Sequence, residues 1–361
     1  MTRLAVVDRS RLRVVDVERR KTVDISALAD SRLANRQPAW SPDGARLAWS
    51  AFDRRQADSP ATLALATPEG TWRVDHPAVF VPFYLAWRPD GQAVAALAEG
   101  PIGLELTVTD APTGDCEIIH RGAPLYFAWS PDGALAIHSG VGEAALLDVR
   151  GIGYDNDAFR SVVPGTFSAP AFIDGGGVLA VVARADTPEL VVLDRSASVE
   201  RVVSGAEFGA RFVVDASGAW VASTSARGSS GAFVVHHLPT DTLAFVDDKS
   251  PALFAWSPDA QHLLFTRLVE VGDFPILEWC TWHDGEVRVH ARARTTPTFG
   301  REVLPFHEQF ARSHSWWSPT SDAFCYAALD DRGNDTIWVA TLRSERPERL
   351  VTGSLAVWSP R

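Results

Sequence analysis

The sequence has little cysteine, and the few it has are scattered. Cys116, Cys280 and Cys325 are odd in number and far apart, and they form no Cys-x-x-Cys pair. A disulfide framework or a cysteine-based zinc site is therefore not expected, and reduced thiols favour a cytoplasmic location. We predict no metal site and no cofactor.

Long apolar runs and basic clusters are also lacking. No run reaches the roughly 18 apolar residues of a membrane span, and the N-terminal apolar stretches are too interrupted by charge for a signal peptide. The net charge is −11 over 361 residues, whereas a nucleic-acid binder needs a basic footprint to neutralise phosphates. We therefore expect neither nucleic acid nor a membrane as a partner.

Tryptophan, in contrast, is abundant, with thirteen residues. A repeated motif, Trp-Ser-Pro-Asp-Gly, explains the excess, and two degenerate copies fit the same register. The eight copies begin at Trp40, Trp87, Trp129, Phe172, Val214, Trp256, Trp317 and Trp358. Successive copies are 41 to 47 residues apart, except for one interval of 61. A period of about 40–45 residues is typical of a propeller or a solenoid array.

Each repeat holds short apolar runs separated by Gly, Pro, Asp and Ser, as four strands joined by turns would. If Arg361 were followed by Met1, Leu4 would stand seven positions after Trp358, as Leu47 stands seven after Trp40. Residues 354–361 and 2–28 are therefore expected to share one closing blade. The prediction is an all-β, eight-bladed β-propeller with four-stranded antiparallel blades, in a single domain over residues 1–361.

The motif itself indicates a structural role. We expect its aromatic residue to end the innermost strand of a blade and to pack between blades. Pro, Asp and Gly then suit a turn, since Pro presets φ, Asp caps through its side chain and Gly accepts a positive φ.

These repeats resemble the TolB-like (PD40, WD40-like) propeller repeat, which also occurs in the propellers of prolyl-oligopeptidase-type enzymes. The resemblance covers essentially the whole chain and implies the propeller fold, but one propeller hosts many chemistries. The sequence contains no Gly-x-Ser-x-Gly nucleophile elbow, and we expect no hydrolase domain.

The 61-residue interval holds an insertion at 295–314. It contains two His, two Arg and two Glu among Phe residues, and we expect one short helix around 305–312. We expect the loop to cover the mouth of the central channel, either as part of a binding site or as a structural plug. Its candidate ligand-binding residues are Arg301, Glu302, His307, Arg312 and His314.

A second signal comes from the positions three residues before each motif aromatic. These are Gln37, Tyr84, Tyr126, Ala169, Arg211, Leu253, His314 and Leu355. Five of the eight are polar, and Arg and His suit an anionic or carbonyl-bearing ligand. We add Gln37, Tyr84, Tyr126 and Arg211 to the candidate ligand-binding residues. Hydrogen bonding between blades is the alternative.

Three functions stay open. The first is a propeller that binds a small molecule or a peptide at the channel mouth, and we expect it to be a monomer. The second is an enzyme, such as a hydrolase, lyase or cyclase, with His314, His307 and Arg211 as candidate catalytic residues. The third is a scaffold for a protein partner.

Overall fold

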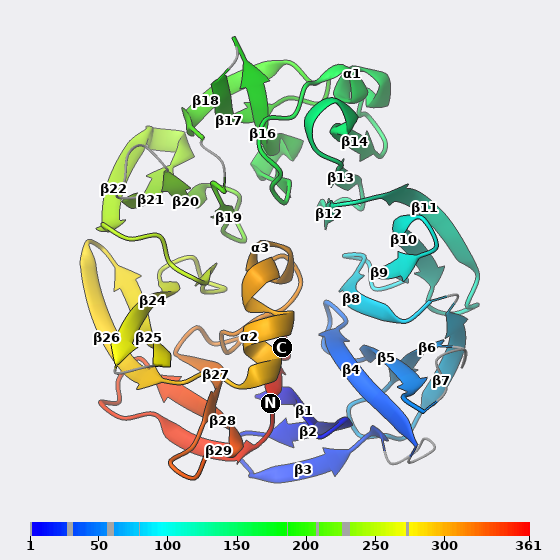
Figure 1. The fold of residues 1–361 in the computed structure, drawn as a ribbon, viewed down its shortest axis with the longest axis vertical. Helices are drawn as coiled ribbons and strands as arrows, with labels where there is room; N and C mark the ends of the chain where they lie inside the picture. The colour runs from blue at the N-terminus through cyan, green and yellow to red at the C-terminus, as the bar shows by residue number, and fades with distance from the viewer. Residues whose placement is uncertain are drawn as a thin grey trace. The chain divides into compact units, whose positions relative to one another are not determined.

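A computed structural model describes residues 2–26, 32–55, 61–78, 80–185, 187–206, 209–225, 232–271 and 274–361. It confirms the predicted all-β fold, an eight-bladed β-propeller of antiparallel blades (Figure 1). The chain divides into two compact units, one of Met1–Arg121, His290–Pro305 and Ser313–Arg361, the other of Gly122–Val289 and Phe306–Arg312. Residues 27 and 28 of the expected closing blade lie outside the described residues.

The first unit contains four sheets. Their strands are β3 (Lys21–Asp24), β2 (Arg11–Asp16), β1 (Arg3–Asp8) and β30 (Leu355–Trp358); β4 (Leu33–Trp40), β5 (Leu47–Asp53), β6 (Ala61–Ala66) and β7 (Arg73–Ala78); β8 (Pro82–Trp87), β9 (Ala93–Gly100), β10 (Gly103–Asp110) and β11 (Cys116–Gly122); and β27 (Ala323–Leu329), β28 (Asp335–Thr341) and β29 (Glu348–Thr352).

The second unit also contains four sheets. Their strands are β12 (Leu125–Trp129), β13 (Leu135–Ser139) and β14 (Leu146–Arg150); β15 (Ala171–Phe172), β16 (Val178–Arg184), β17 (Thr187–Leu193) and β18 (Val199–Gly205); β19 (Phe212–Val214), β20 (Trp220–Ser225), β21 (Ala232–His237) and β22 (Thr242–Asp247); and β23 (Phe254–Trp256), β24 (Leu263–Val271), β25 (Phe274–His283) and β26 (Glu286–Ala293).

Helical segments are short. They are η2 (Gly142–Ala144), α1 (Asn156–Ser161), η3 (Asp174–Gly176), η4 (Leu238–Thr240), α2 (Pro297–Glu302), η5 (Leu304–Phe306) and α3 (His307–Phe310). Among the described residues, none of the helices is long and apolar enough to cross a membrane.

Two sheets have three strands in the described parts of the chain. After β14, the chain forms α1 rather than an outer strand, and the Asp155 side chain caps this helix by accepting a hydrogen bond from the Ala158 amide (3.0 Å). In the β27 sheet, the inner position is held by a single bridge from Trp317 to Phe324. The expectation of four strands per blade therefore holds for six sheets.

Motif aromatics end the inner strands, from β4 at Trp40 to β30 at Trp358. Three motif indoles donate a hydrogen bond to the neighbouring inner strand, at the carbonyl one residue before that strand's own motif position. These bonds join Trp40 to Val357 (3.0 Å), Trp87 to Ala39 (2.9 Å) and Trp256 to Val213 (3.3 Å). These three tryptophans therefore connect adjacent blades within each unit.

The residues after Trp40 form the expected turn. The amide of Gly44 donates to the carbonyl of Ser41 (2.8 Å), and Gly44 has φ +67°, which only glycine adopts at little cost. The Asp43 carboxylate accepts from the Ser41 hydroxyl (2.6 Å) and from the Ala45 amide (3.0 Å). These bonds lower the pKa of Asp43, with the Ser41 hydroxyl as the largest cause.

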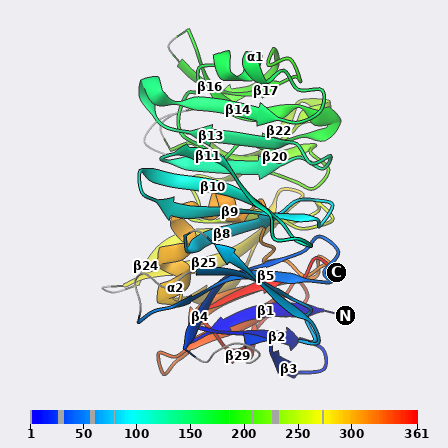
Figure 2. The same cartoon turned by 90° about the vertical axis from the view of Figure 1, so that its right-hand side faces the viewer.

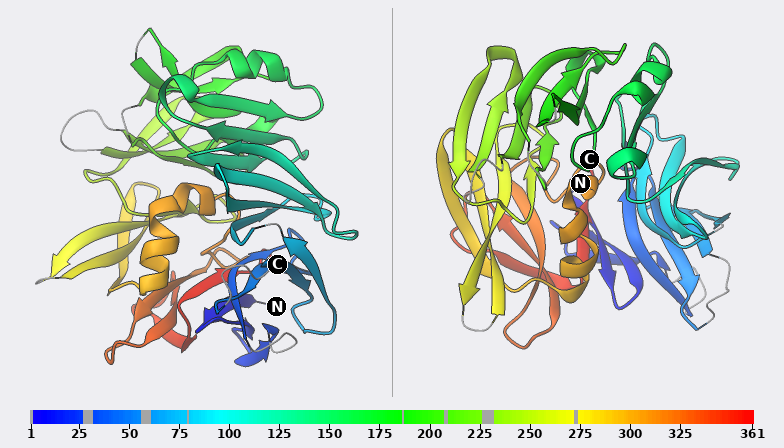
Figure 3. Two further views of the ribbon diagram at one scale, coloured as in Figure 1. Left: turned by 45° about the vertical axis from the view of Figure 1, so that its right-hand side comes forward. Right: turned by 45° about the horizontal axis from the view of Figure 1, so that its top comes forward.

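The first sheet joins strands from both ends of the chain. Strand β30 pairs antiparallel with β1, so that Leu4 faces Trp358, as Leu47 faces Trp40 in the β4–β5 pair. Figures 2 and 3 show the N- and C-termini close to each other, with the red β30 beside the blue β1. This sheet therefore depends on side chains and hydrogen bonds from both ends of the sequence.

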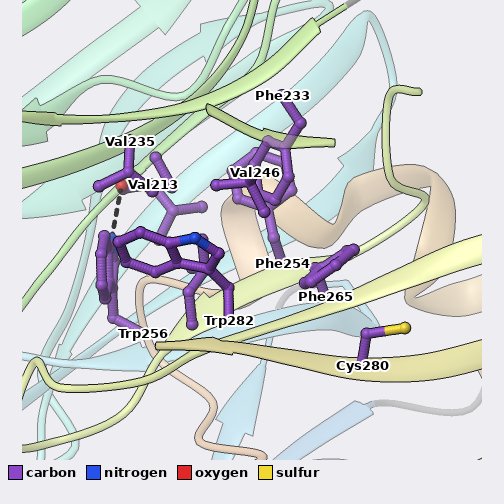
Figure 4. Packing of buried hydrophobic residues seen from close by; sticks show 11 residues of the cluster. Val213, Phe233, Val235, Val246, Phe254, Trp256, Phe265, Cys280 and Trp282 are labelled. Carbon is purple, nitrogen blue, oxygen red and sulfur yellow. Dashed lines mark hydrogen bonds between the residues drawn. The ribbon is translucent and has the colours of Figure 1, made fainter. Parts of the chain in front are cut away.

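The core consists of side chains packed between neighbouring sheets. In the second unit, Phe233, Phe254 and Phe265 meet with ring centroids 5.0 to 5.6 Å apart, and Trp256 meets Trp282 edge to face (Figure 4). All five are almost fully buried. Such contacts between adjacent blades replace the single central core of an ordinary domain.

Candidate functional site

The insertion is helical over more of its length than expected. Instead of one helix around 305–312, it forms α2, η5 and α3 in succession. The Thr296 hydroxyl accepts from the Phe299 amide (3.3 Å), and Pro297 occupies the first helical turn, two features that start a helix. Its central segment, Phe306–Arg312, belongs to the second unit, and the rest belongs to the first.

Helix α2 is fixed to the first unit on one face. Thr296 also donates its hydroxyl to the Ser354 carbonyl (2.7 Å), and Phe299 and Val303 are buried. Thr298 and Glu302 are four residues apart and so share another face of the helix. That second face forms one wall of a cavity.

The cavity has a volume of about 330 Å³ and lies within the first unit. Its walls come from the β1–β2 turn, β4, the β5–β6 connection, α2 and the first residues of β28 and β30. The lining residues are Val7, Arg9, Ser10, Asn35, Arg36, Gln37, Arg54, Thr298, Glu302, Asp335, Ser354 and Leu355.

Three lining residues have backbone conformations that favour glycine. Arg9 (φ +46°) and Ser10 (φ +74°) form the two-residue turn between β1 and β2, where Asn-Gly is usual. Gln37 (φ +54°) lies where the pairing of β4 with β5 shifts register between Arg36 and Ala39. Each left-handed residue costs about 1–2 kcal/mol, and such strain concentrates at functional sites.

Asn35 holds the strained turn against β4. Its backbone amide and its side-chain Nδ2 both donate to the carbonyl of Ser10, at 3.1 and 2.9 Å. The indole of Trp49 donates to Asn35 Oδ1 (2.8 Å). These hydrogen bonds therefore hold the backbone of the turn that carries Arg9, whose side chain is exposed.

Three arginines and two carboxylates line the cavity, a local positive excess in a chain of net charge −11. Glu302 pairs with Arg36 (3.7 Å). In the described part of the chain, Arg9 and Arg54 make no ion pair. Burial raises the pKa of Asp335, the neighbouring carboxylate of Asp8 adds to the effect, and the positive charge of Arg9 opposes it. The cavity is therefore suited to a negatively charged group.

Gln37 joins the helix to the inner strand. Its side chain is 4% exposed, and its Nε2 donates to Glu302 Oε2 (3.3 Å). Its Oε1 is buried and accepts no hydrogen bond from any residue that the structure describes. Gln37 and Glu302, two of the predicted ligand-binding residues, are thus brought together at the cavity.

Tyr84 and His314, also predicted, meet elsewhere in the first unit. The Tyr84 hydroxyl and His314 Nδ1 each lie 2.6 Å from the hydroxyl of Ser313. Burial lowers the pKa of His314 to about 4, against a hydrogen bond to the Pro38 carbonyl that acts in the opposite direction. The imidazole is thus neutral at pH 7, and neither His314 nor Tyr84 lines the cavity described above.

In the second unit, α3 brings its own polar residues together. His307 is buried, and its Nδ1 lies 3.3 Å from Arg211 Nη1. Arg211 also donates to the Ser250 hydroxyl (2.9 Å) and to the Ala252 carbonyl (3.4 Å). His307 and Arg211, two candidate catalytic residues, are therefore neighbours and are held by protein groups.

Glu308 is the buried acid of this cluster. Burial raises its pKa to about 7, against the positive charges of Arg312 and Arg211. Burial of the Tyr126 side chain raises the pKa of Tyr126, and the charge of Glu308 adds a smaller effect in the same direction. Arg312 donates to the carbonyls of Ala169 (2.9 Å) and Phe212 (3.3 Å). The predicted Arg211, Arg312 and Tyr126 thus lie near a carboxyl group that the sequence did not single out, and the predicted His307 contacts Arg211.

Gln309 was missed as well. Its side chain is buried and pairs with both backbone groups of Phe127 in β12, accepting from the amide (2.8 Å) and donating to the carbonyl (2.7 Å). Strand β12 is at the edge of its sheet, so Gln309 completes the hydrogen bonding that a further strand would supply.

No family model matches the chain, and no curated protein sequence matches it. Solved structures do. A eukaryotic initiation factor aligns with a TM-score of 0.61 at 12% identity, over 100% of this chain and 99% of that chain. A prolyl endopeptidase aligns with a TM-score of 0.56 at 12% identity, over 91% of this chain and 50% of that chain. TolB from Acinetobacter baumannii aligns with a TM-score of 0.49 at 14% identity, over 97% of this chain and 79% of that chain.

The likeness is one of fold. The initiation factor and the prolyl endopeptidase support the propeller fold expected from the repeats, and at such identities no activity is carried over. The named proteins also differ in what they do, so the site has to be judged by its own residues.

The cavity contains several residues that the sequence did not single out, namely Arg9, Ser10, Arg54, Thr298 and Asp335. Arg9 and Ser10 left one signal, a two-residue hairpin turn without Gly or Asn. Conversely, the predicted Arg301 is exposed on α2 and does not line the cavity. No group of three or more His, Cys, Asp or Glu within the described ranges is arranged to hold a metal ion.

Proposed function

We propose that the protein binds a small organic anion in the cavity beside α2. The observation that carries this proposal is the pair of exposed arginines, Arg9 and Arg54, that line the cavity together with Arg36 and make no salt bridge among the described residues, although Arg9 lies near Asp335. Arginine offers a planar fork of N–H donors that matches carboxylate and phosphate oxygens.

The size of the cavity supports a small molecule rather than a peptide. Its volume of about 330 Å³ is at the lower end of the range of ligand pockets, roughly 300–1,000 Å³. The strained backbone at Arg9 and Ser10 and the hydrogen bonds from Asn35 support a prearranged site. We also propose the cytoplasmic location and monomeric state that the sequence led us to expect.

Isothermal titration calorimetry with a panel of small carboxylates and phosphates tests the proposal. An anion that binds the wild type should bind Arg9→Asn about tenfold more weakly, because one charge-assisted hydrogen bond is removed. Asn is chosen because it tolerates a positive φ, so the turn is kept. Binding should also weaken as salt is added.

The matched control is Arg346→Asn, an exposed arginine in the turn at the opposite end of β28 from Asp335. It should bind as the wild type does. If no member of the panel binds, or if both variants lose affinity equally, the cavity is not an anion site.

A further inference from the structure

The carbonyl oxygen of the Gln37 side chain is a buried acceptor on a residue that lines the cavity. Which end of the Gln37 amide is nitrogen and which is oxygen follows from Glu302. Because a carboxylate oxygen accepts hydrogen bonds, the atom that faces Glu302 Oε2 (3.3 Å) is Nε2. Oε1 is thereby left as the acceptor, and it is buried in a residue only 4% exposed.

A buried acceptor with no protein partner is uncommon, because its burial costs free energy that a hydrogen bond would recover. Here the same residue also has a left-handed backbone, at a bulge between β4 and β5. The acceptor and the bulge therefore coincide at one residue of the cavity wall.

A donor on a ligand in the cavity would supply the missing partner. The donor could belong to a hydroxyl or to an ammonium group, and the surroundings distinguish the two. Three arginines against the carboxylates of Glu302 and Asp335 leave the lining with a net positive charge, which disfavours a cationic donor relative to a neutral hydroxyl. A hydroxyl is therefore the donor that fits an anion site.

We propose that the ligand is a hydroxylated organic anion, and that Gln37 Oε1 selects it by accepting a hydrogen bond from a ligand hydroxyl. This proposal rests on the proposed function, since the anionic group of the ligand would be bound by the cavity arginines. Gln37 would thus be the specificity-determining residue of the site. The anionic group itself is a carboxylate or a phosphate, which share the arginine-binding chemistry.

Matched probes test the hydroxyl. Gluconate is compared with hexanoate, and glucose 6-phosphate with hexyl phosphate, by calorimetry on the full chain. Each of the four probes has six carbons. The two members of a pair carry the same anionic group and differ in their other oxygen substituents, and one pair carries a carboxylate while the other carries a phosphate. In the wild type, the hydroxylated member of at least one pair should bind more tightly, by roughly tenfold for a hydroxyl bonded to a buried acceptor.

Gln37→Met keeps the length of the side chain and removes the acceptor. It should reduce the preference for the hydroxylated probe to near unity, while the affinity for the plain anion changes little. The exposed Gln92→Met is the control and should keep the wild-type preference. If Gln37→Met does not fold, Gln37→Asn keeps an amide at a positive φ but withdraws it by one methylene, and it should also lose the preference.

The outcomes separate the two proposals. Equal binding of plain and hydroxylated anions, or a preference that Gln37→Met leaves intact, overturns the role of Gln37 and leaves the anion site standing. Absence of binding for all four probes overturns the anion site itself.

Discussion

Glu308 shows how burial changes the chemistry of a single residue. The carboxyl is almost fully buried beside Arg312 and Arg211, and its pKa is raised to about 7. Since this value exceeds the ordinary 4.5, the folded state retains the proton to higher pH than the unfolded state. The contribution of Glu308 to stability is therefore full below pH 4.5 and is lost as the pH rises toward 7.

Replacing Glu308 with Gln should remove this dependence. Between pH 4.5 and 7, the free energy of unfolding of the wild type should fall relative to Glu308→Gln, on the order of 3 kcal/mol over the whole window. Urea unfolding at several pH values measures the difference, in which the titration of other groups, including His314, cancels. Parallel curves for the two proteins would show that Glu308 does not titrate in this range.

At the scale of elements, the insertion contains two short helices with different attachments. Helix α2 is capped by Thr296 and held through Phe299 in the first unit, where it lines the cavity. Helix α3 belongs to the second unit, where Gln309 pairs with β12. Neither helix is long enough to be stable alone, so each depends on these tertiary contacts.

Gln309→Ala should therefore destabilise the second unit. The variant removes the two hydrogen bonds that Gln309 makes to the backbone amide and carbonyl of Phe127, which costs roughly 2–4 kcal/mol. Urea unfolding measures the loss, and hydrogen exchange of the Phe127 amide should become faster. The exposed Gln261→Ala serves as the control; if it destabilises the protein as much, the pairing with β12 is not the cause.

At the scale of the whole molecule, the two ends of the chain share one sheet through the β1–β30 pair. Deleting residues 354–361 removes β30 and exposes the apolar edge formed by Leu4 and Val6, so the melting temperature should fall sharply. A melting temperature like that of the wild type would show that β30 adds little to the fold.

A milder variant tests the same contact. Trp358→Ala keeps the backbone of β30 and removes a side chain that is 2% exposed, so it should cost about 3–5 kcal/mol. Differential scanning calorimetry measures both variants. The exposed Trp72→Ala is the control and should melt near the wild type.

The sequence by itself determined the fold, because each repeat contains the residues that end its inner strand and form the following turn. Trp40 and its equivalents mark the ends of inner strands, and Asp43 and Gly44 specify the turn through local hydrogen bonds and a positive φ. The register of Leu4 with Trp358 follows from the same seven-residue spacing. Such signals are short-range and repeated, so they can be read from one chain.

The sequence also pointed to Gln37 and to the 295–314 insertion, since both depart from the repeat. Only the tertiary structure showed that Gln37 bonds with Glu302, and that Arg9, Arg54 and Asp335 line the same cavity. It also decided that His314 and Arg211 belong to separate clusters, in different units. The physical reason is that packing over long sequence separations decides which side chains become neighbours and which acceptors are left buried.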